Sequence, residues 1–319
     1  MQKQEMERLA IPAIKTVLVP LDGSAVAEDV LPYVKMICGA FQATPHLLSI
    51  ADPGLDDAIA ARPDTKPLVE QMETHASRYL EKMSADFKSA RLVPQTSVKA
   101  GSAGDIIVNT AKEINASLIA MSTHGRSGVS RMVYGSVADR VIHDIGSVPI
   151  FMVRPPASGD KPAAAPSQLK NVIMPLDGSK LGEASLPYAV AMARKMNLTV
   201  HLIQVVNTAQ LTAWGDPTLS GAPTGIASVE LMSSIEDAAK EYISDTAAAL
   251  ESAGVKTVQK VLIGSATWQI VSYAHKMENS FVSMTTHGRT GLKRAIMGSI
   301  ADGVLRESGE PVLMIPSKR

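Results

Sequence analysis

The chain has 319 residues and a mass of 33.7 kDa, a length that predicts two domains, each large enough for its own core. Its 31 basic residues balance its 31 acidic residues, which argues against a general nucleic-acid-binding protein. The single cysteine, Cys38, rules out a disulfide framework and a cysteine-based zinc site. The sequence has no apolar run of membrane-spanning length and begins with polar residues, so we expect no membrane span and a cytoplasmic location.

Apolar runs of strand length alternate with helical patterns along the first half of the chain. The predicted strands are Thr16–Val19, Leu47–Ala51, Thr96–Ala100, Leu118–Met121 and Pro149–Val153. The predicted helices are Ala25–Gly39 with Ser24 as its cap, Pro67–Ser89, one between Gly101 and about Asn115, and one beginning at Ser136. The second half has the same series, with strands at Asn171–Met174, Thr199–Val206, Lys256–Ile263, Phe281–Met284 and Pro311–Ile315, and a long helix at about Val229–Ala253.

Two segments of the first half recur in the second half. Val19–Val34 and Met174–Ala189 share nine of sixteen residues, and Met121–Ile142 and Met284–Leu305 share twelve of twenty-two. Between the halves, Arg154–Gln168 is rich in proline and small residues, which is typical of an exposed linker. The sequence therefore predicts a duplicated domain, with one copy at residues 12–154, a linker at 155–168 and a second copy at 169–319.

Alternating strands and helices predict the fold class: two tandem doubly wound α/β domains, each with a parallel sheet covered by helices on both faces. In such sheets ligands bind beyond the carboxyl ends of the strands, where the winding reverses. The apolar last strands, Ile150–Val153 and Val312–Ile315, are edges that need covering. We therefore expect them to pair with each other in an intramolecular pseudo-dimer, and further association into a homodimer is left open.

A glycine pattern after the fourth strand of each half carries the chemistry. Gly125 is followed by nine residues and then by Gly135-Ser136, which opens a helix, and the second half repeats this pattern at Gly288 and Gly298-Ser299. Glycine lets the backbone approach a ligand closely, and a helix N-terminus offers unpaired N–H groups to a phosphate. The alternative is a purely structural helix start, because both serines also fit a Ser-x-x-acid capping pattern. The Walker and dinucleotide glycine patterns are absent from the sequence.

With these paired motifs, the chain resembles a tandem universal stress protein over both halves. Nucleotide-binding members of that family carry G-x-x-G-x9-G-[ST] after the fourth strand and an Asp just after the first. The resemblance implies a five-stranded parallel sheet in each domain, of the adenine nucleotide alpha hydrolase-like type. It also implies pairing of the last strands and ATP held at the strand ends. The sequence does not rank ATP against ADP or AMP, and any Mg²⁺ is expected to arrive with the nucleotide.

The resemblance assigns nucleotide-binding residues one position at a time. Asp22 and Asp177 match the Asp at the adenosine end, and Ile50 and Val205 match the second-strand position whose backbone meets adenine. The other assigned residues belong to the glycine motifs: Met121, Ser122, Gly125, Arg126, Gly135, Ser136 and Val137 in the first half, and Met284, Thr285, Gly288, Arg289, Gly298, Ser299 and Ile300 in the second. The chain departs from the family at the first glycine, where it has Ser122 and Thr285. A side chain there either crowds the ribose or donates a hydroxyl to it.

The two halves differ close to these residues. Trp268 stands where the first half has Asp105, and we expect its ring to stack on a base or to fill the pocket. The long segment Thr208–Ala227 is either a lid over the second site or a surface loop. Two unequal sites are therefore expected.

The histidines of the glycine motifs, His124 and His287, bear on whether the protein is an enzyme. Neither has an acid beside it, and the sequence has no nucleophile motif and no cluster with metal-ligand spacing. We therefore expect both rings to orient their loops by hydrogen bonding. Together with the resemblance, this favours an ATP-binding regulatory protein of the stress response with little or no turnover. A slow ATPase or nucleotidyl-transfer enzyme and a nucleotide-free partner-binding scaffold are the alternatives.

Overall fold

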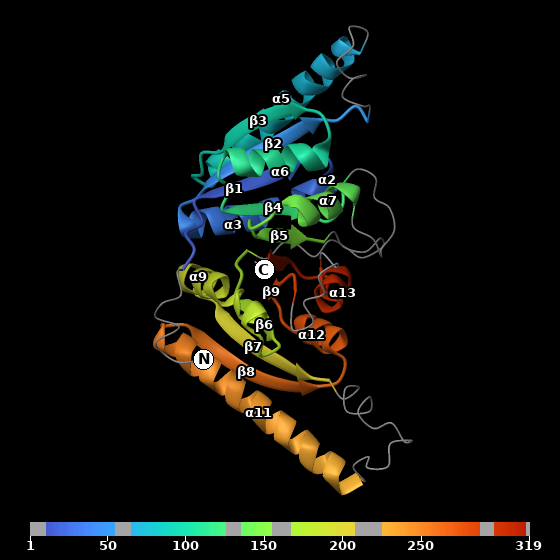
Figure 1. Ribbon diagram of the computed structural model, residues 1–319. Coiled ribbons are helices and arrows are strands. Elements are labelled where there is room, and N and C mark those ends of the chain that lie inside the picture. Colours follow the sequence, from blue (N-terminus) through green and yellow to red (C-terminus); the bar gives the residue numbers. More distant parts are fainter. Residues whose placement is uncertain are drawn as a thin grey trace, which may run out of the picture. The chain divides into compact units, whose positions relative to one another are not determined.

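The computed structural model describes residues 11–54, 65–125, 135–154, 167–207, 225–287 and 297–316 (Figure 1). They fall into two compact units. The first-repeat unit groups Ala13–Gln168 with Pro311–Pro316, and the second-repeat unit is built from Leu169–Glu310. Most of the predicted linker lies outside the described residues.

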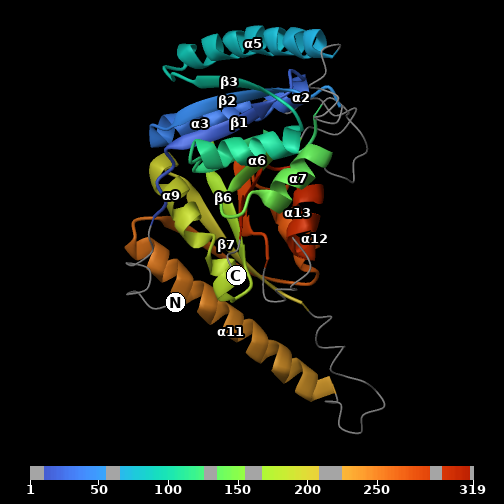
Figure 2. The same cartoon turned by 45° about the horizontal axis from the view of Figure 1, so that its top comes forward.

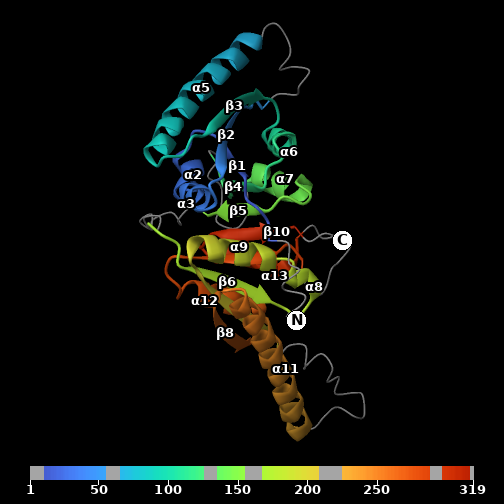
Figure 3. The ribbon, with the colours of Figure 1, turned by 90° about the vertical axis from the view of Figure 1, so that its left-hand side faces the viewer.

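The first-repeat unit is a doubly wound α/β sheet. Its strands are β1 (Thr16–Leu21), β2 (Thr44–Ala51), β3 (Gln95–Ala100), β4 (Leu118–Ser122), β5 (Ile150–Val153) and β10 (Val312–Ile315), in the order β3-β2-β1-β4-β5-β10. Its helices are α2 (Ala25–Glu28), α3 (Leu31–Phe41), α5 (Lys66–Ser89), α6 (Ala103–Glu113) and α7 (Ser136–Asp144). Figure 3 shows α3 and α5 on one face of this sheet and α6 and α7 on the other. Figure 2 shows α5 running along the β3 side of the sheet.

The second-repeat unit has the same winding. Its strands are β6 (Asn171–Leu176), β7 (Thr199–Val206), β8 (Lys256–Ile263) and β9 (Ser280–Thr285), paired in parallel in the order β9-β6-β7-β8. Its helices are α8 (Lys180–Glu183), α9 (Leu186–Met196), α11 (Gly225–Ser252), α12 (Ala266–Ala274) and α13 (Ser299–Glu307). The predicted strands and the alternation of strands with helices are confirmed in both repeats, and the strand order reverses between the first and fourth strands, as a doubly wound sheet requires.

The single helix predicted over Ala25–Gly39 is wrong. The structure has the short helix α2, a break, and then α3, which ends at Phe41 beyond the expected stop. Pro32 lies in the first turn of α3, where its missing N–H costs nothing, whereas inside a continuous helix it would remove a hydrogen bond and clash with the preceding turn. The second repeat has the same break, with a proline in the first turn of α9. The predicted cap is confirmed, because the Ser24 hydroxyl accepts a hydrogen bond from the Ala27 N–H at 3.2 Å.

The last strands of the two repeats pair with each other, as predicted. Strand β10 lies antiparallel to β5, with Val312 opposite Met152 and Met314 opposite Ile150. Both strands are fully buried, so the pairing covers the apolar edge of β5. Within the part of the chain that the structure describes, no helix is both long enough and apolar enough to span a bilayer.

Candidate functional site

The first candidate site begins in the turn after β1. Asp22 Oδ1 accepts hydrogen bonds from the Ser24 N–H at 2.9 Å and from the Ser24 hydroxyl at 2.6 Å. The second repeat has the same arrangement, with Asp177 Oδ1 accepting from the Ser179 N–H at 3.0 Å and from its hydroxyl at 2.6 Å. Each serine also caps the short helix that follows, so one residue fixes both the helix start and the carboxylate.

The glycine motif brings the end of β4 against this aspartate. A methyl group built on Gly125 would lie 2.5 Å from Asp22 Oδ2, so a side chain at this position would force the carboxylate to move. Two of the assigned residues, which lie about a hundred positions apart in the chain, are therefore neighbours in the structure. The counterpart of Gly125 in the second repeat, Gly288, lies outside the described residues.

The end of the fourth strand also meets the start of the following helix. The Gly135 N–H donates to the Thr123 carbonyl at 3.0 Å, and the Gly298 N–H donates to the Thr286 carbonyl at 2.7 Å. Each nine-residue loop therefore returns to the strand that it left. Because of this closure, the N-termini of α7 and α13 lie at the carboxyl edges of their sheets, where doubly wound folds bind ligands.

The structure contradicts the alternative interpretation, in which Ser136 and Ser299 cap these helices. The capping residues are Gly135 and Gly298, which have extended backbones with ψ of 147° and 148° and provide no side-chain cap. The two serines are the first residues inside the helices, one position too far along to act as caps. The first turns of α7 and α13 thus have no side-chain acceptor from their capping residues, which is the condition under which an anion can accept those N–H groups.

A cavity of about 210 Å³ opens beside Asp22 and Ile50. It lies between the carboxyl ends of β1 and β2 and the first half of α5, and its walls are Asp22, Gly23, Ser49, Ile50, Ala51, Leu68, Gln71, Met72, His75, Ala76 and Tyr79. Its volume is below the roughly 300–1,000 Å³ of pockets that enclose a whole ligand, so it has room for only part of a ligand. Of the assigned residues that the structure describes, Asp22 and Ile50 line it.

The contribution of α5 to this cavity was missed in the sequence. Leu68, Met72, Ala76 and Tyr79 follow helical spacing, which alone indicates a core-facing stripe. Leu68, near the start of α5, is 49% exposed, so the N-terminal part of the stripe does not face the core. The sequence did contain a signal for this wall, because the apolar stripe lies on a helix that is longer than the strands beside it.

A tyrosine on each long helix holds that helix against the aspartate turn. The Tyr79 hydroxyl donates to Glu28 Oε1 of α2 at 3.0 Å, and the Tyr242 hydroxyl donates to Glu183 Oε1 of α8 at 3.0 Å. Burial, followed by the negative charge of Glu183, raises the pKa of Tyr242 above its usual value, so the hydroxyl stays a donor. The equal contacts show that α5 and α11 pack in the same register.

Side chains of the glycine motif hydrogen-bond within their own loops. The Thr123 hydroxyl lies 2.9 Å from His124 Nδ1, and the Thr286 hydroxyl lies 3.1 Å from His287 Nδ1. The Thr285 hydroxyl donates to the His287 carbonyl at 2.7 Å, and the Ser122 hydroxyl lies 3.4 Å from the His124 N–H. These contacts agree with the expectation that the histidines orient the loop. They also give Ser122 and Thr285 a role in holding the turn.

The remaining assigned residues are placed as follows. Met121, Ser122, Met284 and Thr285 are buried at the strand ends, Val137 is half-buried, and Ser136, Ser299 and Ile300 are exposed at the helix starts. Val205 is half-buried on β7. Arg126, Gly288 and Arg289 lie outside the described residues, as does most of the segment Thr208–Ala227 that was considered as a lid. The described residues contain no group of three or more His, Cys, Asp or Glu side chains able to hold a metal ion.

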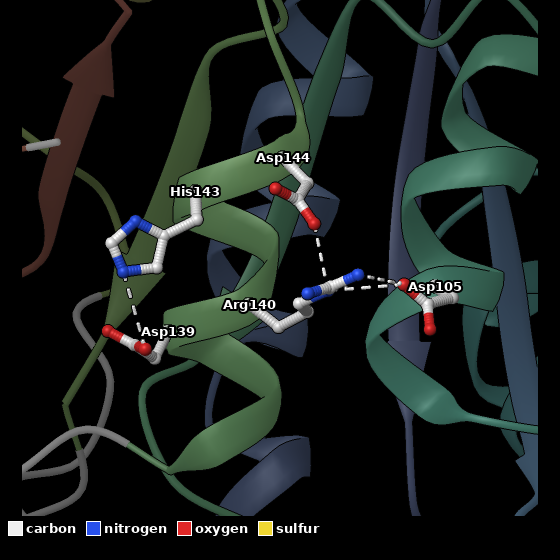
Figure 4. A network of polar contacts seen from close by, with 5 residues as sticks. All are labelled: Asp105, Asp139, Arg140, His143 and Asp144. Atoms are coloured by element: carbon white, nitrogen blue, oxygen red, sulfur yellow. Dashed lines mark hydrogen bonds and ion pairs between the residues drawn. The ribbon is translucent and has the colours of Figure 1, made fainter.

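Trp268 does not fill a pocket, because its side chain is 63% exposed in the first turn of α12. In the first repeat, the equivalent surface is polar (Figure 4). There Arg140 of α7 lies 2.9 Å from Asp105 of α6 and 2.8 Å from Asp144. The two repeats therefore present different surfaces on this face. Of the two alternatives for Trp268, filling the pocket is wrong, and stacking on a base stays a prediction.

The family model described as the universal stress protein family matches residues 13–154 and again residues 168–316. The chain belongs to this family. Universal stress protein MJ0531 of Methanocaldococcus jannaschii is 29% identical over 147 residues, which cover 46% of this chain and 81% of that protein. A universal stress protein of Mycolicibacterium smegmatis is 22% identical over 249 residues, or 77% of each chain. The crystal structure of a universal stress protein from Archaeoglobus fulgidus matches with a TM-score of 0.68 at 21% identity, covering 95% of this chain and 98% of that one.

Proposed function

We propose that each repeat binds an adenine nucleotide, with ATP as the first candidate, at the carboxyl edge of its sheet. The observation that carries this proposal is the bare glycine cap at the start of α7 and of α13, each bonded back to the preceding strand. The N–H groups of Ser136 and Val137, and of Ser299 and Ile300, are the donors proposed for the phosphates. The serine hydroxyls add further donors.

The proposed position of the adenosine end is the cavity beside Asp22. Its walls combine apolar side chains with a few polar groups, which is typical of a site for a planar base with a polar edge. The aspartate carboxylate is an acceptor suited to the ribose hydroxyls or the base amino group. In the second repeat, Asp177 has the same bonds to its serine and takes the same role in the proposal.

Within this proposal the protein works as a nucleotide-dependent regulator of a stress response, with binding rather than rapid turnover. His124 Nδ1 lies at hydrogen-bond distance from the neighbouring threonine hydroxyl, an arrangement that orients the ring rather than one that couples it to an acid. A weak ATPase is the competing proposal. It is distinguished by following phosphate release from a chain loaded with one equivalent of ATP per site.

The first experiment is mass spectrometry of the ligand released from freshly purified protein, together with calorimetric titration of added ATP, ADP and AMP. We expect one or two ATP molecules per chain. If no nucleotide is released and no heat is measured, the proposal is wrong, and the glycines serve a partner-binding scaffold.

Gly135→Ala and Gly298→Ala assign the sites. At both positions the backbone suits alanine, and the added methyl group would lie 3.5 Å and 3.4 Å from the nearest carbonyl oxygen, so both chains should fold. The methyl group would stand where a phosphate must approach, so each variant should lose about one binding equivalent, with a weakening of at least roughly tenfold. Thermal unfolding is the control. Retention of both equivalents in the double variant would contradict the assignment.

A further inference from the structure

Ser49 and Gln204 occupy the same place in the two sheets. In the first repeat, β1 and β2 pair so that Leu21 lies opposite Ser49, and in the second, β6 and β7 pair so that Leu176 lies opposite Gln204. Each leucine is the residue directly before the site aspartate. Ser49 lines the cavity of the first repeat, so Gln204 stands at the corresponding wall of the second.

The Gln204 side chain lies on the face of β7 that α11 covers. Side chains along a strand alternate between faces, so Gln204 and His201 are on opposite faces. His201 Nδ1 lies 2.9 Å from the hydroxyl of Tyr273, which belongs to α12 on the other face. Helix α11 packs against β7 and β8 as α5 packs against β2 and β3.

Gln204 also carries an unused acceptor. Its Oε1 atom is buried and has no hydrogen-bond partner among the residues that the structure describes. Buried polar atoms are nearly always paired, and leaving one unpaired is costly. An acceptor of this kind beside the site aspartate suits an incoming amino or hydroxyl donor.

On the wall formed by the long helix, the first repeat has the longer polar side chains and the second repeat has the shorter ones. The tyrosines that bond α5 to α2 and α11 to α8 set a common register for the two long helices. In that register, Gln71 corresponds to Ser234, and His75 corresponds to Ala238. The helix therefore loses two long polar side chains where the strand gains one.

The apolar part of the wall is retained. Leu68, which lines the cavity, corresponds to Leu231, and Met72 corresponds to Ile235. Leu68 and Leu231 are 49% and 42% exposed, so both helices keep an uncovered apolar face near the aspartate turn. The apolar face of either helix suits a planar base. The polar group at the edge of the base then comes from the helix in the first repeat and from strand β7 in the second.

We propose that the carboxamide of Gln204 pairs with the amino-bearing edge of the adenine base in the second repeat, and that Gln71 and His75 of α5 take this role in the first. The inference rests on the proposed nucleotide binding. A carboxamide offers one acceptor and two donors, which match the amino group and the adjacent ring nitrogen of adenine. The two repeats thus recognise the same base from opposite walls, so substitutions can alter one site without altering the other.

The test uses the full chain with Gly135→Ala, so that binding at the second repeat is measured alone. Gln204→Met keeps the length of the side chain and removes its hydrogen-bonding groups. We expect this change to weaken ATP binding roughly tenfold to a hundredfold, as loss of a paired base edge does. Binding of purine riboside 5′-triphosphate, which has the same ring and phosphates but no amino group, should change much less. Thermal unfolding of each variant checks that the fold is retained.

The matched control is the Gly298→Ala chain, in which only the first repeat binds. There Gln204→Met should leave ATP binding unchanged, and Gln71→Ser with His75→Ala should weaken it. Equal weakening of ATP and of the analogue by Gln204→Met, or no weakening of either, would overturn the inference while nucleotide binding itself stands. Loss of all binding in the Gly135→Ala chain would overturn it as well. If the unmodified chain binds no nucleotide, the proposed function is wrong too.

Discussion

The contact between α6 and α7 in the first repeat and that between α12 and α13 in the second have the same geometry with the side chains exchanged. In the first, Gly104 lies under Arg140, and a methyl group built on the glycine would be 2.5 Å from Arg140 Cγ. In the second, the corresponding residues are Thr267 and Gly303, and a methyl group on Gly303 would be 2.6 Å from Thr267 Cγ2. In the first repeat the larger residue is on α7 and the glycine is on α6. In the second repeat the larger residue is on α12 and the glycine is on α13.

At this contact, the residues of both helices differ between the repeats in a matched way. A close helix contact has room for one side chain, so a larger residue on one helix requires a smaller one on its neighbour. The surface changed with the contact. The first repeat has Asp105 paired with Arg140, whereas the second has the exposed Trp268 and no arginine at the corresponding position.

The largest effect is expected from adding a methyl group to this contact. Gly303→Ala would place it 2.6 Å from one branch of Thr267 and 3.1 Å from the other, so exchanging the branches does not relieve the clash. We expect the free energy of unfolding to fall by about 1–3 kcal/mol, measured by urea denaturation. Adding Thr267→Gly should restore most of the loss. If the double variant is as unstable as the sum of the single variants, the two positions are not coupled.

A smaller effect is expected at a histidine that both repeats bury. His46 lies between Gln95 and Ser97 of β3, and His201 lies between Tyr273 and Asn171. Burial lowers the pKa of both rings below the usual value of 6.5. Below that value the unfolded chain binds protons that the folded chain resists, so stability is full above pH 6.5 and declines as the pH falls.

The measurement is the urea midpoint of unfolding between pH 7.5 and pH 5. His46→Gln and His201→Gln should each lower stability at neutral pH and flatten its decline in acid. His75→Gln, at an exposed position, is the control for the substitution itself. The hydrogen-bond partners of the two rings differ between the repeats. Unequal flattening would therefore show how far each set of neighbours controls the pKa of its ring. An unaltered decline in the double variant would contradict the prediction.

The smallest effect is expected from the ion pair that only the first repeat has. The hydrogen bonds from Arg140 hold the pKa of Asp105 below its usual range, but both side chains are more than half exposed. Solvent screens such pairs strongly, so Asp105→Asn should change the thermal midpoint only slightly, and the change should vanish in high salt. A large loss that persists in high salt would mean that Arg140 depends on the pair to cover Gly104.

The sequence predicted the features that depend on local pattern. The duplicated strands, the Ser24 cap and the pairing of the last strands all rest on apolar periodicity or on short motifs. The break after α2 was missed because one proline within an otherwise helical pattern outweighs the apolar spacing on both sides of it. The sequence could not decide whether Ser136 and Ser299 cap α7 and α13, since adjacent Gly and Ser both suit that position and only the backbone shows which one is used.

The wall that α5 contributes to the cavity was harder to predict. Whether an apolar residue of a long helix faces the core or a ligand depends on where the sheet beneath it ends, which local sequence does not record. The assignment of Asp22 and Gly125 to one site was easier, because parallel strands end at a common edge. In the structure, Gly125 lies so close to Asp22 that a methyl group on the glycine would displace the carboxylate.

The pairing of β5 with β10 has a consequence for how the chain is made. The first-repeat unit includes residues 311–316, so its sheet is incomplete until the whole second repeat has left the ribosome. At translation rates of roughly 5–20 residues per second, the roughly 160 residues between the two strands take on the order of ten seconds to synthesise. During that interval the nascent chain presents β5 as an open, apolar strand edge. A chaperone that binds such edges would meet this protein at that stage, before the stress-response function proposed here can begin.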